Sequence, residues 1–160
     1  MTGSVDVSPR EVFERLHERV RDDYDMDGQA DLYAPGGVLE LPFAPPGAPR
    51  QIRGREEIRA FLRAAGHRVR QAGRRIVRYD PVVVHETADP EVIVAEFELH
   101  GEVSATGAAY HMPFIQVLRV RDGQIVSMRD YFAGEVLEVA FDDGPRVKVR
   151  SENESRTRRR

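Results

Sequence analysis

The 160-residue sequence contains no cysteine, no tryptophan and a single lysine. Without cysteine, the chain has no disulfide framework, thiolate metal site, iron–sulfur cluster or cysteine nucleophile. It also has no run of about 18 apolar residues, so we expect no membrane-spanning segment and no membrane partner. The N-terminal residues form no apolar stretch of the signal-peptide type, which favours a cytoplasmic location.

What is present is typical of one globular domain. Hydrophobic residues make up 41% and charged residues 32% of the chain, and a chain of this length can bury one core. The formal net charge is −3, which argues against a nucleic-acid partner.

Helical patterns dominate the first half of the chain. A first helix is predicted over 8–23, because Ser8, Pro9 and Glu11 form a capping-box start and apolar residues follow at helical spacing. A second, short helix is predicted over 27–33, ended by the Pro-Gly-Gly run that follows, and a short strand over 38–41. A third helix is predicted over 54–65, with Gly66 as its C-cap.

Strand patterns dominate the second half. Strands are predicted over 76–86, 91–100, 110–121 and 124–132, with Gly101 ending the second and Asp122-Gly123 forming the last turn. A short helix is predicted over 136–141, and the polar, basic residues 151–160 are expected to be disordered. Helices followed by hairpin-connected strands predict an α+β fold.

Three segments carry a family resemblance: DGQADLYAPGGVLELP, IRGREEIRAFL and VLRVRDGQIVSMRDYF. They resemble the SnoaL-like part of the nuclear transport factor 2 superfamily, which includes ketosteroid isomerases, limonene-epoxide hydrolases, polyketide cyclases and phenazine-biosynthesis proteins. The resemblance implies a domain over 8–140, with 141–160 as a C-terminal extension. It further implies a cone-shaped antiparallel sheet curved around three helices, an apolar cavity, and a homodimer formed through the convex face. The motifs are specific for the fold and not for one function.

Strand alternation sorts the side chains of each strand onto two faces, and the resemblance implies which face lines that cavity. The candidate substrate-binding residues on this face are Tyr110, Phe114, Gln116, Leu118 and Met128. Tyr33, at the end of the predicted second helix, is a further candidate, and its alternative is packing in the core. This set is apolar with a few polar groups, as expected for a small-molecule site.

Asp130 is the leading catalytic candidate. It alternates with Met128 and Phe132, so its carboxylate should be desolvated and its pKa raised toward the range useful for proton transfer. The resemblance places it where limonene-epoxide hydrolases carry a catalytic Asp. The alternative is a structural ion pair with Arg129 or with an arginine of a neighbouring strand.

Glu96 and Glu98 are further candidates, and the face they occupy is open. The pattern alone favours a core formed by Ala95, Phe97 and Leu99, which would leave both glutamates in solvent. The resemblance instead places both glutamates in the cavity and the apolar residues at the dimer interface. Epoxide hydrolases of this fold have an Arg and an Asp at the positions of Glu96 and Glu98, so the missing Arg argues against their mechanism.

Glu40 lies close to the position of the catalytic Asp of ketosteroid isomerases, although alignment through the shared proline puts that Asp on Leu41. The oxyanion Tyr of the isomerases falls on His17 and their second Asp on Gln116, so steroid isomerisation is not implied. Both side chains can donate hydrogen bonds and could form an oxyanion hole, with Tyr33 assisting. Alternatively, His17 is a partly exposed helix residue and Gln116 a satisfied core amide.

Together these features predict an enzyme that uses neither metal nor cofactor. It would carry out acid/base chemistry (isomerisation, cyclisation or epoxide opening) on a small, apolar, oxygenated metabolite of secondary metabolism. Asp130 would move the proton, and Glu40, Glu96 or Glu98 would be the second acid/base group. The alternative is a non-catalytic ligand-binding or assembly module of the same fold.

Overall fold

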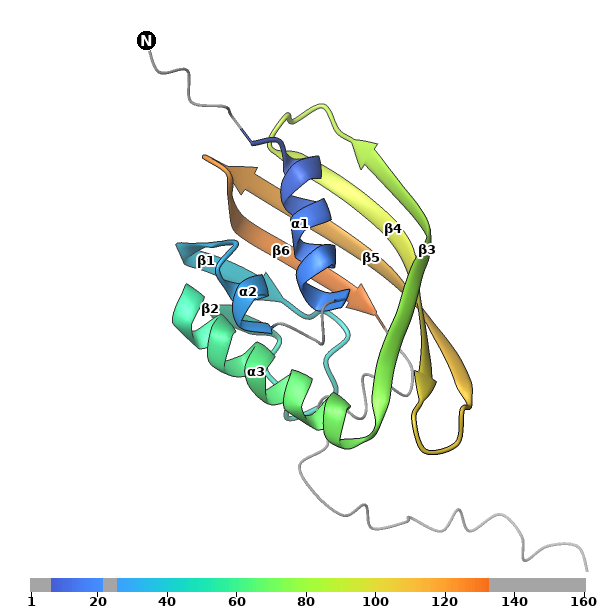
Figure 1. Ribbon diagram of the computed structural model, residues 1–160. Helices are drawn as coiled ribbons and strands as arrows, with labels where there is room; N and C mark the ends of the chain where they lie inside the picture. The colour runs from blue at the N-terminus through green and yellow to red at the C-terminus, as the bar shows by residue number, and fades with distance from the viewer. Residues whose placement is uncertain (1–6, 22–25, 133–160) are drawn as a thin grey trace, which may run out of the picture.

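The computed structural model describes residues 7–21 and 26–132. Three helices, α1 (Pro9–Arg21), α2 (Met26–Ala30) and α3 (Arg55–Gln71), lie against one face of a curved sheet (Figure 1). Its strands are β1 (Tyr33–Glu40), β2 (Gln51–Arg53), β3 (Arg74–Glu86), β4 (Val92–Val103), β5 (Ala109–Arg121) and β6 (Gln124–Phe132). The predicted α+β fold is confirmed.

The six strands follow the order β2-β1-β6-β5-β4-β3. All neighbouring strands pair antiparallel except β1 and β6, which are parallel. This parallel pair differs from the predicted, purely antiparallel sheet. It joins the first strand of the chain to the last described one and brings Leu39 level with Met128 in the middle of the sheet.

Helix α1 begins with the predicted capping box. The backbone N–H of Ser8 donates to Glu11 Oε2 (2.8 Å), and the backbone N–H of Glu11 donates to Ser8 Oγ (3.2 Å). These bonds satisfy donors that the first helical turn leaves free. The apolar face of the helix buries Val12, Phe13 and Leu16 against the sheet.

The predicted boundaries around residues 30–41 are wrong. Helix α2 ends at Ala30, and β1 begins at Tyr33 and runs through the Pro-Gly-Gly sequence that was expected to stop a helix. The strand accommodates these residues through a shift in its register with β6 between Tyr33 and Val38. Strand β2 was not predicted, because three residues are too short to show an alternating pattern.

Gly66 and Gly101 were predicted to end elements, and each instead lies inside one. At Gly66 of α3 an added Cβ would lie 2.7 Å from Met26 Cγ, so the missing side chain lets α2 pack closely on α3. At Gly101 of β4 the ring of Tyr110 from β5 covers the backbone, and an added Cβ would collide with it. Both glycines are explained by close packing and not by chain reversal.

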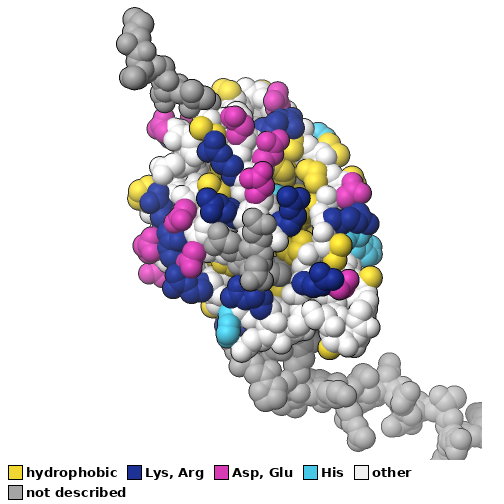
Figure 2. Space-filling view, viewed as in Figure 1, with side chains coloured by type: hydrophobic (Ala, Val, Ile, Leu, Met, Phe, Trp, Pro, Cys, Tyr) yellow, Lys and Arg dark blue, Asp and Glu magenta, His cyan; other side chains and the backbone are white. Residues whose placement is uncertain are grey.

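Surface charges are mixed in sign. Arg59 of α3 binds Asp31 (2.7 Å) and Glu56 (3.0 Å), and Arg63 binds Asp27 of α2 (2.6 Å). On the face in Figure 2, dark-blue and magenta side chains are interspersed, with no large area of one sign. Within the described residues, no helix combines the length and hydropathy required to cross a bilayer.

The predicted helix at 136–141, the disordered residues 151–160 and the domain boundary at 140 lie outside the described residues.

Candidate functional site

A cavity of about 140 Å³ lies between the helices and the sheet. Its wall is apolar except for five side chains, namely His17, Gln29, Tyr79, Gln116 and Asp130. No lysine or arginine among the described residues reaches this wall. The site is therefore suited to a small, uncharged and largely apolar molecule.

Two neighbouring rows of side chains on the sheet form one side of the cavity. Phe97, Phe114 and Phe132 are cross-strand neighbours on β4, β5 and β6, and their rings stack at centroid distances of 4.9 and 5.0 Å. The next row contains Gln116 opposite Asp130. Strand pairing thus sets a carboxylate and an amide directly beside an aromatic surface.

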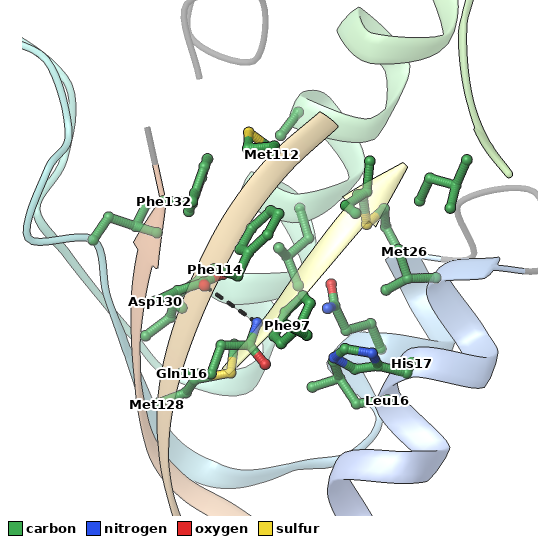
Figure 3. Close-up of a pocket in the computed structure, with 18 of the residues that line it drawn as sticks. Leu16, His17, Met26, Phe97, Met112, Phe114, Gln116, Met128, Asp130 and Phe132 are labelled. Atoms are coloured by element: carbon green, nitrogen blue, oxygen red, sulfur yellow. Dashed lines mark hydrogen bonds between the residues drawn. The ribbon is translucent and has the colours of Figure 1, made fainter. Parts of the chain in front are cut away.

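Asp130 accepts a hydrogen bond from Gln116 Nε2 at 3.2 Å (Figure 3). Burial in the apolar cavity raises the pKa of Asp130 to about 7, and the hydrogen bond from Gln116 partly opposes this rise. No ion pair forms with Arg129, which is exposed on the other face of β6. A carboxyl group with a pKa near 7 can both accept and release a proton at neutral pH.

His17 faces the same space from helix α1 (Figure 3). Its ring lies among those of Phe13, Tyr79 and Phe97, at centroid distances of 4.1, 4.6 and 4.4 Å. Burial lowers the pKa of His17 to about 4, and a polar interaction with Gln116 partly opposes this fall. His17 is therefore a neutral imidazole at pH 7, able to donate one hydrogen bond and accept another.

Three buried polar atoms at or near the cavity have no hydrogen-bond partner among the described residues. They are the Oε1 atoms of Gln29 and Gln116, which belong to the cavity wall, and the hydroxyl of Tyr33. Buried polar groups are usually paired, and an unpaired one costs stability. Those in the wall would gain a partner from a bound molecule that reaches them.

Five of the predicted site residues come together in this cavity: His17, Phe114, Gln116, Met128 and Asp130. The alternation predicted for β5 and β6 is therefore correct over these positions. His17 is more than a partly exposed helix residue, because it faces the cavity. Gln116 is not a fully satisfied core amide, because its Oε1 has no hydrogen-bond partner among the described residues.

The cavity-facing assignment of Glu96 and Glu98 is wrong. Residues 95, 97 and 99 of β4 are buried on the inner face, so the two glutamates project outward. There Glu96 pairs with His85 at 2.6 Å, and Glu98 pairs with His111. The pattern of apolar residues identified the correct face, and the resemblance did not. Because these apolar residues are buried within the chain, they no longer support the predicted homodimer, which remains a prediction.

Four other predicted residues also lie outside the cavity wall. Glu40 alternates outward between the cavity-lining Leu39 and Leu41, level with Arg129 of β6. Leu118 and Tyr33 are fully buried in the core behind the wall. Tyr110 packs over Gly101, and its hydroxyl donates to the backbone oxygen of Arg75 at 3.4 Å. Each position follows from strand register or packing that the sequence did not reveal.

Gln29 and Tyr79 were not predicted as site residues. Gln29 belongs to a five-residue helix, too short for its buried face to appear as a periodic pattern. Tyr79 lies in a strand whose register with β4 shifts between Tyr79 and Val82, which interrupts the alternation. The Asp-Pro pair at residues 80 and 81, a frequent mark of irregular backbone, was the available signal.

The described residues contain no group of three or more His, Asp or Glu side chains arranged to hold a metal ion. The polar side chains of the cavity wall carry one carboxylate, one imidazole, one phenol and two amides. This set suits hydrogen bonding to an organic molecule.

The raised pKa of Asp130 predicts a pH-dependent effect of Asp130→Asn on stability. Folded Asp130 keeps its proton up to about pH 7, whereas the unfolded chain releases it near the ordinary aspartate pKa of 3.8. The wild type is therefore progressively destabilised as the pH rises from about 4 to 7. The stability advantage of Asp130→Asn over the wild type should grow across this interval and stay constant above it.

Urea unfolding of both proteins at pH 4.5, 6, 7 and 8 measures this difference. Because both proteins contain His17, its opposite effect, a loss of stability as the pH falls from 6.5 toward 4, cancels in the comparison. Glu57→Gln, on the exposed face of α3, is the control and should show no such trend. A difference independent of pH would show that Asp130 is not desolvated.

Comparison with known proteins gives one consistent result. The SnoaL-like domain model matches residues 13–128. An uncharacterised PhzA/B-like protein of Pseudomonas aeruginosa is 39% identical over 114 residues, which cover 71% of this chain and 77% of that protein.

Solved structures with a similar fold are found as well. A protein of Bacillus subtilis, provisionally named an isomerase, has a TM-score of 0.69 at 29% identity and covers 82% of this chain and 91% of its own. A protein of Xanthomonas campestris, provisionally named a polyketide cyclase, has a TM-score of 0.60 at 22% identity, with coverages of 78% and 89%. The second likeness establishes the fold alone.

Proposed function

Because this chain belongs to the SnoaL-like domain family, we propose that it is a cofactor-independent enzyme that moves a proton on a small, apolar carbonyl compound. The observation that carries this proposal is the placement of Asp130. It is the one acidic side chain in the wall of a largely apolar cavity, as far as the described residues extend, and the amide of Gln116 donates a hydrogen bond to its carboxylate. A carboxylate in such surroundings is a typical general base.

The proposed first step is removal of a proton from the carbon next to the substrate carbonyl. The C–H bond breaks, Asp130 takes the proton, and the electron pair moves onto the carbonyl oxygen. His17, as a neutral imidazole, can donate a hydrogen bond to that oxygen. Donors aimed at developing charge inside a water-poor site stabilise the transition state.

The second step returns the proton and distinguishes two reaction types. In an isomerisation, Asp130 gives its proton to a different carbon of the same molecule. In an aldol-type cyclisation, the enolate carbon attacks a second carbonyl, and the new alkoxide takes the proton. The described residues place no second carboxylate in the cavity, which favours these one-base reactions over epoxide opening with a separate acid and base.

The test is a screen of the purified protein against enones, terpenoid epoxides and aromatic polyketide esters, with conversion followed by mass spectrometry. We expect turnover of an enone or a polyketide ester, rising as the pH increases through 7 because Asp130 is then ionised. Conversion of epoxides alone would contradict the one-base mechanism. Binding without any conversion would instead support the second candidate, a non-catalytic ligand-binding module, which the apolar wall also favours.

A further inference from the structure

Gln29 is a polar side chain of the cavity that the proposed proton transfer does not use. It belongs to the cavity wall, its residue is only 7% exposed, and its Oε1 has no hydrogen-bond partner among the described residues. An acceptor that is buried without a partner costs about as much as a lost hydrogen bond. An acceptor in the wall of a cavity can regain that bond from a ligand.

The short helix that carries Gln29 is held firmly in place. The guanidinium of Arg59 donates to the backbone oxygen of Asp27 (2.9 Å) and to Asp31 Oδ1 (2.7 Å), on either side of Gln29. Met26 packs on Gly66 of α3, where no side chain separates the two helices. The backbone that carries Gln29 is thus fixed before any ligand arrives, which reduces the entropy lost on binding.

Gln29 and the Gln116–Asp130 pair reach the cavity from different layers of the fold. Gln29 comes from α2 in the helical layer, and Gln116 and Asp130 come from adjacent strands of the sheet. Figure 3 shows Met26 of α2 and His17 of α1 across the cavity from Asp130 and Gln116. A molecule that fills the space between the layers therefore meets polar groups on two sides.

We infer that Gln29 is a specificity-determining residue that accepts a hydrogen bond from a hydroxyl group of the substrate. The ligand class is a small, neutral, hydroxylated carbonyl compound, with its carbonyl toward Asp130 and its hydroxyl toward α2. A cavity of about 140 Å³ suits a compound built on about one ring. The wall has no lysine or arginine among the described residues to balance an anionic ligand. This inference rests on the site of the proposed function and names its substrate class.

The test uses three probes that differ at one position: 4-hydroxyacetophenone, 4-methoxyacetophenone and 4-methylacetophenone. Calorimetry measures their dissociation constants for the wild type and for Gln29→Met, which preserves side-chain length without the amide. We expect the wild type to bind the hydroxy compound about 2- to 10-fold more tightly than the methyl compound. Gln29→Met should abolish this preference, and Gln71→Met, at an exposed position of α3, should keep it.

Several results would overturn the inference. Equal binding of the hydroxy and methyl compounds by the wild type would do so without any variant, even if Gln29→Met failed to fold. If Gln29→Met kept the preference for the hydroxy over the methyl compound, another group of the cavity would be the hydrogen-bond partner of the hydroxyl. Methoxy binding as tight as hydroxy binding would show that the amide N–H faces the ligand, and failure of all three probes to bind would exclude the ligand class.

The binding test does not depend on turnover. A hydroxyl preference that requires Gln29, in a protein that converts nothing, would uphold the inference while the proposed reaction failed. Turnover of a hydroxylated compound that wild type and Gln29→Met bind equally well would uphold the reaction and overturn the inference.

Discussion

Asp130→Asn is expected to lower the turnover number about 10²- to 10⁴-fold for any compound that the wild type converts, the usual contribution of a positioned general base. The amide of asparagine has almost the size of the carboxyl group but cannot take up the proton. Gln116 can rotate its own amide to keep a hydrogen bond at this position, so the cavity should keep its shape. Steady-state kinetics at pH 8, where Asp130 is ionised in the wild type, measure the loss.

Glu40→Gln is the matched control for this variant. It removes one carboxylate from the face of β1 directed away from the cavity, where Glu40 lies level with Arg129 of β6. Its turnover should stay within about twofold of the wild type, because surface substitutions far from the reacting atoms change little. Unchanged turnover in Asp130→Asn would remove Asp130 from the mechanism. An equal loss in both variants would indicate a general effect of charge.

Phe13→Ala should lower the free energy of unfolding by about 3–5 kcal/mol, the typical cost of truncating a fully buried phenylalanine. Phe13 is 2% exposed and packs between α1 and the sheet, with its ring 5.9 Å from that of Phe97. The truncation leaves a void where the helix meets the core. Total stabilities of single domains are about 5–15 kcal/mol, so a large part of the stability would be lost.

Phe43→Ala tests whether burial is the cause. Phe43 is 57% exposed and contacts only the edge of the Tyr131 ring among the aromatic side chains described. Its truncation should cost less than about 1 kcal/mol. Urea unfolding followed by circular dichroism measures both variants. A loss below about 1 kcal/mol for Phe13→Ala would contradict the position of α1 on the sheet.

The local parts of this fold could be predicted because local contacts determine them. The capping box of α1 depends on residues three positions apart, and the hairpin at Asp122-Gly123 depends on two residues with positive φ. The alternation along β5 and β6 is equally local. It correctly placed Phe114, Gln116, Met128 and Asp130 on one face.

Where prediction failed, distant residues decide the structure. Gly66 would be a natural helix end if Met26 did not pack on it, and Gly101 would end β4 if Tyr110 did not cover it. Gln29 carries no sign of its role within its own five residues. Such features depend on contacts between segments, which no window of the sequence contains.

For β4 the apolar alternation and the family resemblance disagreed, and the alternation was correct. Burial of Ala95, Phe97 and Leu99 is driven by the hydrophobic effect within this chain, and it leaves Glu96 and Glu98 on the outer face. The resemblance was correct for the fold and for the cavity positions of His17, Gln116 and Asp130, and wrong for Glu96 and Glu98. Related folds retain their sheets while exchanging side chains, so each residue has to be checked separately.

Hydrophobic periodicity and capping act over a few residues, so the fold class, the elements of the second half and the acidic residue of the cavity could be inferred without a structure. Which polar groups meet depends on the packing of the whole chain. The pairing of β5 with β6 sets Gln116 against Asp130, α1 brings His17 to them, and the contact of α2 with α3 places Gln29 in the same cavity. These contacts depend on strand register and helix packing, which are fixed only when the whole chain folds.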